Sequence, residues 1–168
     1  MTAPCRHLDT IADVPAPGDV CVICIQIGSP WHHLRQCMQC GITLCCDSSP
    51  NRHMTAHHNE TGHPIMRSGQ PDEDWAWCYV DEVTMRPVEG GGYQAFDPFL
   101  ETGAWAAQEH LGGGGSWDVD EDYETDDGFP LGRWVSYARE QRDDGALDAE
   151  EIAAIESLPG WTWEGAGT

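Results

Sequence analysis

Residues 21–63 read CVICIQIGSPWHHLRQCMQCGITLCCDSSPNRHMTAHHNETGH. This stretch contains two C-x2-C turns, Cys21 to Cys24 and Cys37 to Cys40, and each turn puts two sulfurs within reach of one ion. Histidines follow at short spacings, and zinc prefers four tetrahedral ligands drawn from thiolate and imidazole. The pattern predicts a small module built around zinc.

Candidate ligands continue on both sides of this stretch. Disulfides are not expected, because the N-terminus shows no secretion signal and thiols in the cytoplasm stay reduced. Iron–sulfur clusters mostly take thiolates, so the interleaved histidines favour zinc. The ordered set of candidates is Cys5, His7, Cys21, Cys24, Cys37, Cys40, Cys45, His53, His57, His63 and Cys78.

The module is expected to depend on the metal for its fold. Its roughly 80 residues are rich in glycine, proline and polar positions, so they bury a small core. One structural zinc supplies roughly 10–16 kcal/mol of apparent binding energy, most of it coupled to folding. Without zinc we expect no folded N-terminal domain.

The charge of the chain is strongly negative and unevenly distributed. The formal net charge of the 168 residues is −21, with −5 up to Val88 and −16 beyond it. Such a surface repels phosphate backbones and anionic membranes, because affinity for both rests on lysine and arginine. No run of eighteen apolar residues is present to span a membrane. These properties favour a cytoplasmic protein with a protein partner.

The composition changes near Arg86, after which cysteine is absent. Glu89 to Gly92 is typical of a flexible linker. We therefore predict an α+β protein with three parts: a small zinc-stabilised sheet-and-helix module over residues 1–86, a Gly-rich linker over 87–96, and a short all-α three-helix bundle over 97–164.

Three helices are expected in the last part. Asp97 caps the first, whose apolar face comprises Leu100, Ala104, Ala107 and Leu111. The second follows helical spacing at Leu131, Trp134, Val135 and Ala138. The third begins at a capping box formed by Asp148 and Glu151. Trp161 and Trp163 are expected to cover this bundle.

The N-terminal pattern resembles the UBP-type zinc finger, a ubiquitin-binding module of some deubiquitinating enzymes and of one class of histone deacetylase. The resemblance covers about residues 5–85 and rests on the initial C-x-H, on CMQCGITLCCDSSPNRHMTAHHNETGHP and on DWAWCYVDE. CCDSSP and WCYVDE resemble the bacterial branch of that family.

The resemblance implies three cross-braced zinc sites. Asp81 stands where the family has a fourth cysteine, and a carboxylate is an acceptable zinc ligand. Cys46 is an alternative to Cys45, because the spacing to His53 is one residue longer than usual. His32, His33 and His58 fall outside the series and are expected at the surface. The implied sets are Cys21, Cys24, Cys45 and His53; Cys37, Cys40, His57 and His63; and Cys5, His7, Cys78 and Asp81.

Members of this family that read ubiquitin grip a free Gly-Gly carboxyl terminus with aromatic residues and an arginine. Trp77 and Tyr79 match aromatic positions of that pocket. The family arginine is replaced by Asp47, which would repel a carboxylate, so ubiquitin-tail binding is in question and a basic peptide becomes an alternative. Arg52 and Arg67 are candidates to supply the missing cation.

The region DGFPLGRWVSYAREQRDDGALDAEEIAAIESLPGWTWE resembles the helicase-associated domain of some bacterial helicase-like proteins, over about residues 123–164. That family is suspected of touching nucleic acid, but its arginines here stand among many carboxylates. The resemblance therefore supports a fold more than a function.

We interpret the chain as a non-enzymatic zinc-binding adaptor that recognises a protein partner, a peptide or a chain terminus, with contacts at Trp77, Tyr79 and Asp47. One alternative is a nucleic-acid-associated factor working through the C-terminal helices. The other is a hydrolytic or redox zinc enzyme with an open site at Cys5, His7 and Cys78. The identity of the partner and the oligomeric state do not follow from the sequence.

Overall fold

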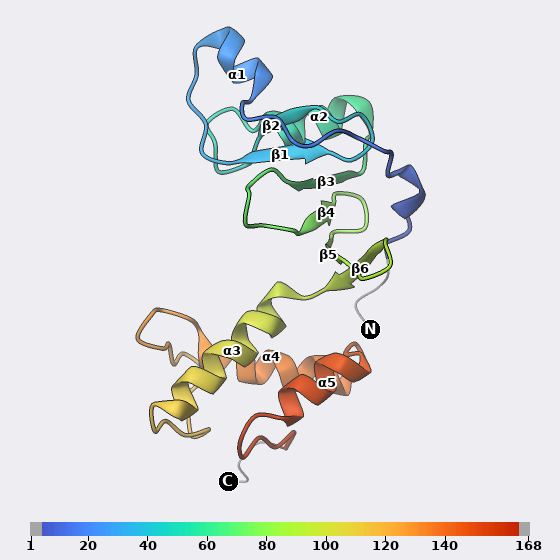
Figure 1. The fold of residues 1–168 in the computed structure, drawn as a ribbon. Coiled ribbons are helices and arrows are strands. Elements are labelled where there is room, and N and C mark those ends of the chain that lie inside the picture. Colours follow the sequence, from blue (N-terminus) through green and yellow to red (C-terminus); the bar gives the residue numbers. More distant parts are fainter. Residues whose placement is uncertain (1–4, 165–168) are drawn as a thin grey trace. The chain divides into compact units, whose positions relative to one another are not determined.

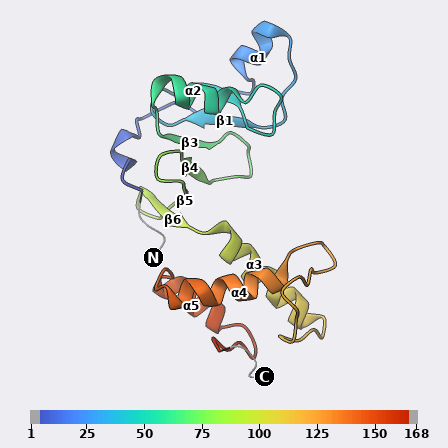
Figure 2. The same cartoon turned by 180° about the vertical axis from the view of Figure 1, so that it is seen from behind.

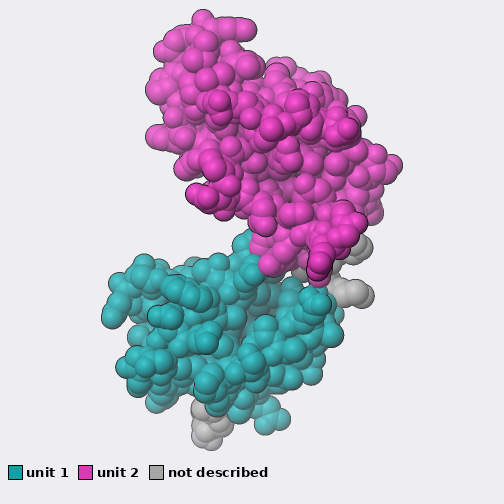
Figure 3. Space-filling view, in the orientation of Figure 1, with its two compact units in different colours: residues 1–2, 97–168 teal, residues 3–96 magenta. Residues whose placement is uncertain are grey.

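The computed structural model describes residues 5–164. Residues 1–4, which belong to the segment that lacked a secretion signal, lie outside this range. The chain divides into two compact units (Figure 3): residues 3–96, and residues 97–168 together with 1–2. Within residues 5–164, no helix is long and apolar enough to cross a membrane. The predicted α+β class is confirmed.

Residues 3–96 fold around one antiparallel sheet with strand order β2-β1-β3-β4-β5-β6 (Figures 1 and 2). All of its strands are short, so few ladder hydrogen bonds hold each of them. The elements of this unit are the 3-10 turn η1 (Leu8–Thr10), α1 (Val22–Ile27), β1 (Leu34–Cys37), β2 (Thr43–Cys45), α2 (His53–Thr61), β3 (Ile65–Ser68), β4 (Ala76–Cys78), β5 (Val83–Pro87) and β6 (Tyr93–Phe96).

Both faces of this sheet carry a small core. Because side chains alternate along a strand, the pair Met66 and Trp77 lies in one cluster while the neighbouring pair Ile65 and Cys78 lies in the other. Cysteines make up much of both clusters: Cys21, Cys24, Cys37 and Cys45 belong to the first, and Cys5 and Cys78 to the second. The packing of this unit therefore depends on what its thiols bind.

The stretch predicted as a flexible linker, residues 87–96, differs from that expectation. Gly90, Gly91 and Gly92 adopt φ values of 92°, 96° and 97°, which only glycine reaches readily. They reverse the chain so that β6 pairs with β5, with Pro87 opposite Tyr93. Tyr93 also packs against the second core cluster. The glycine run therefore closes a hairpin of the sheet.

Residues 97–164 contain α3 (Pro98–Gly112), α4 (Leu131–Asp143) and α5 (Ala149–Glu156). The predicted caps are confirmed. The Asp97 side chain accepts hydrogen bonds from the backbone N–H groups of Phe99 and Leu100. Asp148 and Glu151 form a complete capping box at the start of α5. These caps satisfy N–H groups that have no partner inside the helix.

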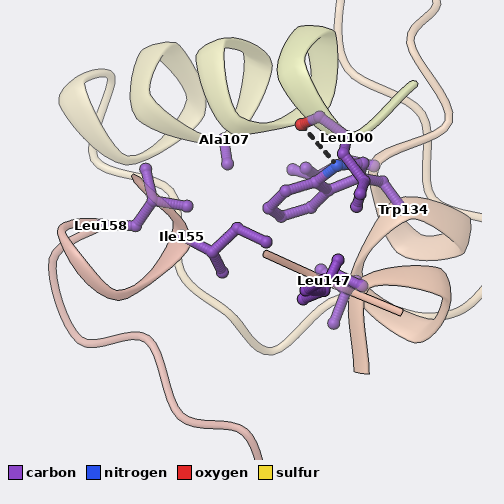
Figure 4. Packing of buried hydrophobic residues seen from close by; sticks show 9 residues of the cluster. Leu100, Ala107, Trp134, Leu147, Ile155 and Leu158 are labelled. Atoms are coloured by element: carbon purple, nitrogen blue, oxygen red, sulfur yellow. Dashed lines mark hydrogen bonds between the residues drawn. The ribbon is translucent and has the colours of Figure 1, made fainter. Parts of the chain in front are cut away.

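Trp134 is the centre of the core in this unit (Figure 4). Its side chain is fully buried, and its indole N–H donates to the carbonyl of Leu100 at 3.1 Å. The predicted face of α3 is confirmed for Leu100 and Ala107, which are buried, and for Ala104, which packs against the same core. Gly103 is buried on this face as well. A Cβ at Gly103 would lie 1.9 Å from Trp134, so the glycine provides the space that the indole fills.

Candidate metal centres

The first cluster joins α1, β2 and α2. The Nδ1 atom of His53 lies 3.4 Å from the sulfur of Cys21, 3.3 Å from that of Cys24 and 3.4 Å from that of Cys45. The sulfurs of Cys24 and Cys45 are 3.8 Å apart. Asn51 donates to Cys24 at 3.7 Å and so orients that thiol from outside the cluster.

The second cluster joins the turn after β1 to α2 and the segment before β3. His57 Nε2 lies 3.4 Å from Cys40 and 3.2 Å from His63 Nδ1. His63 Nδ1 lies 3.4 Å from the sulfur of Cys37. Since His53 and His57 are one turn apart on α2, this helix contributes to both clusters.

The third cluster joins residues near the N-terminus to the end of β4. His7 Nδ1 lies 3.7 Å from the sulfur of Cys78 and 2.8 Å from Asp81 Oδ2. Cys5 completes the group, whose ligand atoms all lie within 4.8 Å of one another. The structure thus brings together each of the three sets that the resemblance implied.

Arg6 fixes the orientation of Asp81. Its guanidinium donates to Oδ1 through Nε at 3.0 Å and NH2 at 2.7 Å, and its backbone N–H donates to Oδ2 at 2.7 Å. These hydrogen bonds, the backbone one first, hold the pKa of the Asp81 carboxyl well below its usual range. Asp81 is therefore an ionised carboxylate with Oδ2 facing His7 and Cys78.

The spacing of the ligand atoms fits tetrahedral zinc in the first two clusters. Bond lengths of about 2.3 Å to sulfur and 2.05 Å to nitrogen would separate two sulfurs by about 3.8 Å, sulfur and nitrogen by about 3.6 Å, and two nitrogens by about 3.3 Å. The corresponding contacts are 3.8 Å, 3.3 to 3.4 Å and 3.2 Å. In the third cluster the 2.8 Å contact of His7 with Asp81 is instead a hydrogen-bond distance.

Several of these thiols would stay protonated without a cation. Burial raises the pKa of Cys5 to about 12 and that of Cys24 to about 11. Zinc binds the thiolate, so metal binding has to displace these protons. Zinc affinity is accordingly expected to rise with pH.

The choice between Cys45 and Cys46, which the sequence left open, is resolved by their positions. Cys45 faces the first cluster, while the Cys46 sulfur lies 3.4 Å from Ser49 Oγ and 3.9 Å from His33 Nδ1. Burial raises the pKa of Cys46, but hydrogen bonds, foremost from Ser49 and the His33 backbone, outweigh it and lower the pKa to about 7.

Replacing Cys45 by serine is expected to remove one zinc ion per chain, because the first cluster loses a thiolate. Replacing Cys46 by serine is expected to leave the zinc content unchanged, since its sulfur belongs to none of the three clusters and faces Ser49 and His33 instead. Zinc per chain, measured by inductively coupled plasma mass spectrometry on both purified variants, checks this. Equal losses in the two variants would contradict the assignment.

The predicted partner-binding residues lie near α2. Asp47 accepts a hydrogen bond from the Thr55 hydroxyl at 2.6 Å, and the Tyr79 hydroxyl lies 3.2 Å from the same Thr55 oxygen. Burial raises the pKa of Tyr79. Trp77 is half-buried and packs against the first core cluster. Asp47 and Tyr79 are thus linked through one side chain.

A surface pocket of about 420 Å³ opens beside this link, along the first two turns of α2. Asp47 and Arg52 place opposite charges on its rim. Arg52 has a left-handed backbone, with φ of 47°, which is unusual for a side chain of its size. The pocket is lined by Asp47, Asn51, Arg52, Thr55, Ala56 and Asn59.

Two of the three histidines expected at the surface have further contacts. His58 stacks on Tyr79 with ring centroids 4.5 Å apart, and its Nδ1 lies 2.8 Å from the carbonyl oxygen of His63. His33 is exposed but its ring lies against Cys46, and His32 is exposed. His58 therefore supports both the second cluster and Tyr79, one of the residues predicted to contact a partner.

The sequence analysis missed the groups around the ligands, chiefly Arg6, Asn51 and His58. Arg6 could have been recognised from the sequence, because it stands between the ligands Cys5 and His7, whose set also contains the acidic ligand Asp81. For Asn51 and His58 nothing in the spacing distinguished them from surface residues.

Two family models match the chain. Residues 20–89 match the Zn-finger in ubiquitin-hydrolases and other protein, and residues 100–164 match the Helicase associated domain. The solution NMR structure of protein RPA1320 from Rhodopseudomonas palustris is 49% identical, covers 51% of this chain and 84% of that chain, and gives a TM-score of 0.45. No curated protein matches the chain significantly. The zinc-finger match and the three clusters together identify zinc as the cofactor.

Proposed function

Because residues 20–89 form a UBP-type zinc finger and residues 100–164 a helicase-associated domain, we propose that this chain is a zinc-stabilised adaptor that recognises a segment of a partner protein. Zinc fingers of this type generally mediate protein interaction. In this proposal the zinc-built unit of residues 3–96 binds the partner, and the three helices of residues 97–164 form the second unit.

The proposal assigns the twelve clustered residues to three zinc ions in a structural role. Each cluster offers four protein ligands, as structural sites do, whereas catalytic zinc keeps one position open. Cys46, the cysteine outside the clusters, is only 6% exposed, which argues against a nucleophile that a substrate must reach. Both observations favour an adaptor over an enzyme.

The observation that carries the proposal is the pocket beside α2. The histidine side chains of the same helix belong to two zinc clusters, so zinc would hold the pocket wall in place. Arg52 in its lining can pair with a carboxylate, and Asp47 can pair with a cation. The Thr55 hydroxyl contacts both Asp47 and Tyr79 and so holds Asp47 in place. A chain terminus, which combines a carboxylate with backbone donors, suits such a pocket.

A second feature also favours a protein partner. Val22, Ile25 and Ile27 on α1 are 39%, 58% and 58% exposed, and Val20 just before them is 38% exposed. These four exposed apolar side chains fall within eight residues, which is more than the single surface residues that need no explanation. They add an apolar contact area to the same zinc-built unit.

The test is selection from a random hexapeptide library with free C-termini, followed by fluorescence anisotropy on the selected peptide and its C-terminal amide. Arg52→Ala is expected to weaken binding of the free acid at least about tenfold, because a charge-assisted hydrogen bond is lost. Arg133→Ala, an exposed arginine of the other unit, is the matched control. Zinc content is measured for each variant.

The selected peptides could instead be basic, bind equally well as free acids and as amides, and depend on Asp47 rather than Arg52. The pocket would then recognise an internal basic segment and not a chain terminus. Failure to select any peptide, or equal losses with Arg52→Ala and Arg133→Ala, would contradict a peptide-binding role for this pocket.

A further inference from the structure

A second pocket lies in the helical unit, which contains none of the three zinc clusters. Its volume is about 560 Å³, and it opens between the C-terminal half of α3 and the loop that leads to α4. Its lining includes aromatic, acidic and histidine side chains, namely Trp105, Glu109, His110, Tyr123, Asp126 and Asp127. None of them takes part in the proposed peptide site.

Trp105 is the unusual residue of this pocket. Its side chain is 59% exposed, although α3 buries Leu100, Ala106 and Ala107 on another face. Tryptophan is highly buried on average, and an exposed one at a concave site is typical of a binding surface. Glu109 follows Trp105 by four residues, so a carboxylate lies one helical turn along the same stripe of α3.

The charged groups of the pocket are all acidic. Glu109, Asp126 and Asp127 are exposed at its lining, and no lysine or arginine lines it within the described residues. Both ring nitrogens of His110 have partners: Nε2 lies 3.0 Å from the carbonyl oxygen of Ser116, and Nδ1 lies 3.3 Å from the Tyr123 hydroxyl.

The walls of the pocket are preformed. Gly115 donates its N–H to the His110 carbonyl at 2.9 Å, and a Cβ at Gly115 would lie 2.2 Å from the His110 ring. On the opposite side, Thr125 and Phe129 close a turn: Thr125 N–H donates to the Phe129 carbonyl at 2.9 Å, and Phe129 N–H donates to Thr125 Oγ1 at 3.0 Å. A ligand therefore meets a fixed shape, which lowers the cost of ordering the site.

We propose that this pocket binds an arginine side chain presented by a basic segment of a partner protein. The guanidinium plane stacks on the Trp105 indole, and the carboxylates of Glu109 and Asp126 accept its hydrogen bonds. Arginine suits the site better than lysine, because a planar cation both stacks on an aromatic face and pairs with carboxylates. The net charge of −16 beyond Val88 attracts a basic partner and repels nucleic acid.

The experiment uses the zinc-loaded full chain and a fluorescein-labelled peptide with two arginines in a glycine–serine frame, at 150 mM salt. The same peptide with citrulline in place of arginine is the ligand control, because citrulline keeps the shape without the charge. Trp105→Ala is expected to weaken binding about tenfold and Glu109→Gln about fivefold. Glu140→Gln removes the same charge from an exposed position of α4 outside the pocket and is expected to change nothing.

Four results would overturn the proposal. Equal losses with Glu109→Gln and Glu140→Gln would reduce the binding to general attraction by an acidic surface. Undiminished affinity of Trp105→Ala would show that the arginine does not stack on the indole. Equal affinity for the citrulline peptide would show that the positive charge is not recognised. If single-stranded DNA binds more tightly than the peptide and Trp105→Ala weakens that binding, the pocket is a base-stacking site instead. Because Trp105 is exposed, circular dichroism is expected to show the same fold for its variant.

Discussion

Removal of zinc by a chelator is expected to unfold residues 3–96 and to leave α3, α4 and α5 folded. The core clusters of the sheet contain Cys21, Cys24, Cys45 and Cys78, each fully buried, and without metal these thiols only fill space. Each structural zinc contributes roughly 10–16 kcal/mol of apparent binding energy, which is as large as the whole stability of an ordinary domain, about 5–15 kcal/mol.

A two-dimensional 15N–1H NMR spectrum recorded before and after chelation checks this expectation. The signals of residues 5–96 are expected to collapse to the dispersion of an unfolded chain, and those of residues 97–164 to stay in place, because the core around Trp134 contains no cysteine. Addition of three equivalents of zinc to the chelator-free protein is the control and is expected to restore the spectrum. A sheet that keeps its dispersion without metal would contradict a structural role for zinc.

Trp134→Ala is expected to destabilise the helical unit by about 3–5 kcal/mol, the usual cost of removing a fully buried tryptophan from a core. Trp134 is 0% exposed and packs between α3 and α5, and its indole also donates to Leu100 (Figure 4). Since 1 kcal/mol shifts Tm by about 4–8 °C in a domain of this size, Tm is expected to fall by at least about 12 °C. Thermal unfolding followed by circular dichroism of the helices measures it.

Two matched variants make the result specific. Trp105→Ala removes the same side chain from an exposed position on α3 and is expected to change stability by about 0.5 kcal/mol or less. Gly103→Ala adds a methyl group where Trp134 already lies and is expected to destabilise by about 1–3 kcal/mol, although alanine is the better helix former. A stabilised Gly103→Ala protein would show that the indole does not fill this space.

The spacing of the cysteines and histidines made zinc binding predictable, because zinc takes four ligands from thiolate and imidazole. The division of these ligands into three sets came from the resemblance to the UBP-type zinc finger. The helix starts at Asp97 and Asp148 were predictable for a similar local reason, since a cap needs only the residues beside it. Both kinds of prediction rest on contacts within a few residues or on a strict coordination rule.

Features that depend on distant contacts were not predictable. A run of three glycines is equally suited to a linker and to a hairpin turn, and only the pairing of Tyr93 with Pro87 decides between them. Gly103 weakened the helix pattern in the sequence, but its purpose depends on Trp134, thirty-one residues later. The choice of Cys45 over Cys46 required the direction of each side chain at the end of β2.

The third cluster has a consequence for the order in which the zinc module assembles. It connects His7 to Asp81 across 74 residues, whereas the first connects Cys21 to His53 across 32 and the second Cys37 to His63 across 26. Each doubling of a loop adds about 0.6 kcal/mol to the entropic cost of closing it. The third zinc closes the longest of the three loops, so its binding carries the largest entropic cost. It is expected to bind last and leave first, which frees the N-terminal segment while the rest of the sheet remains folded.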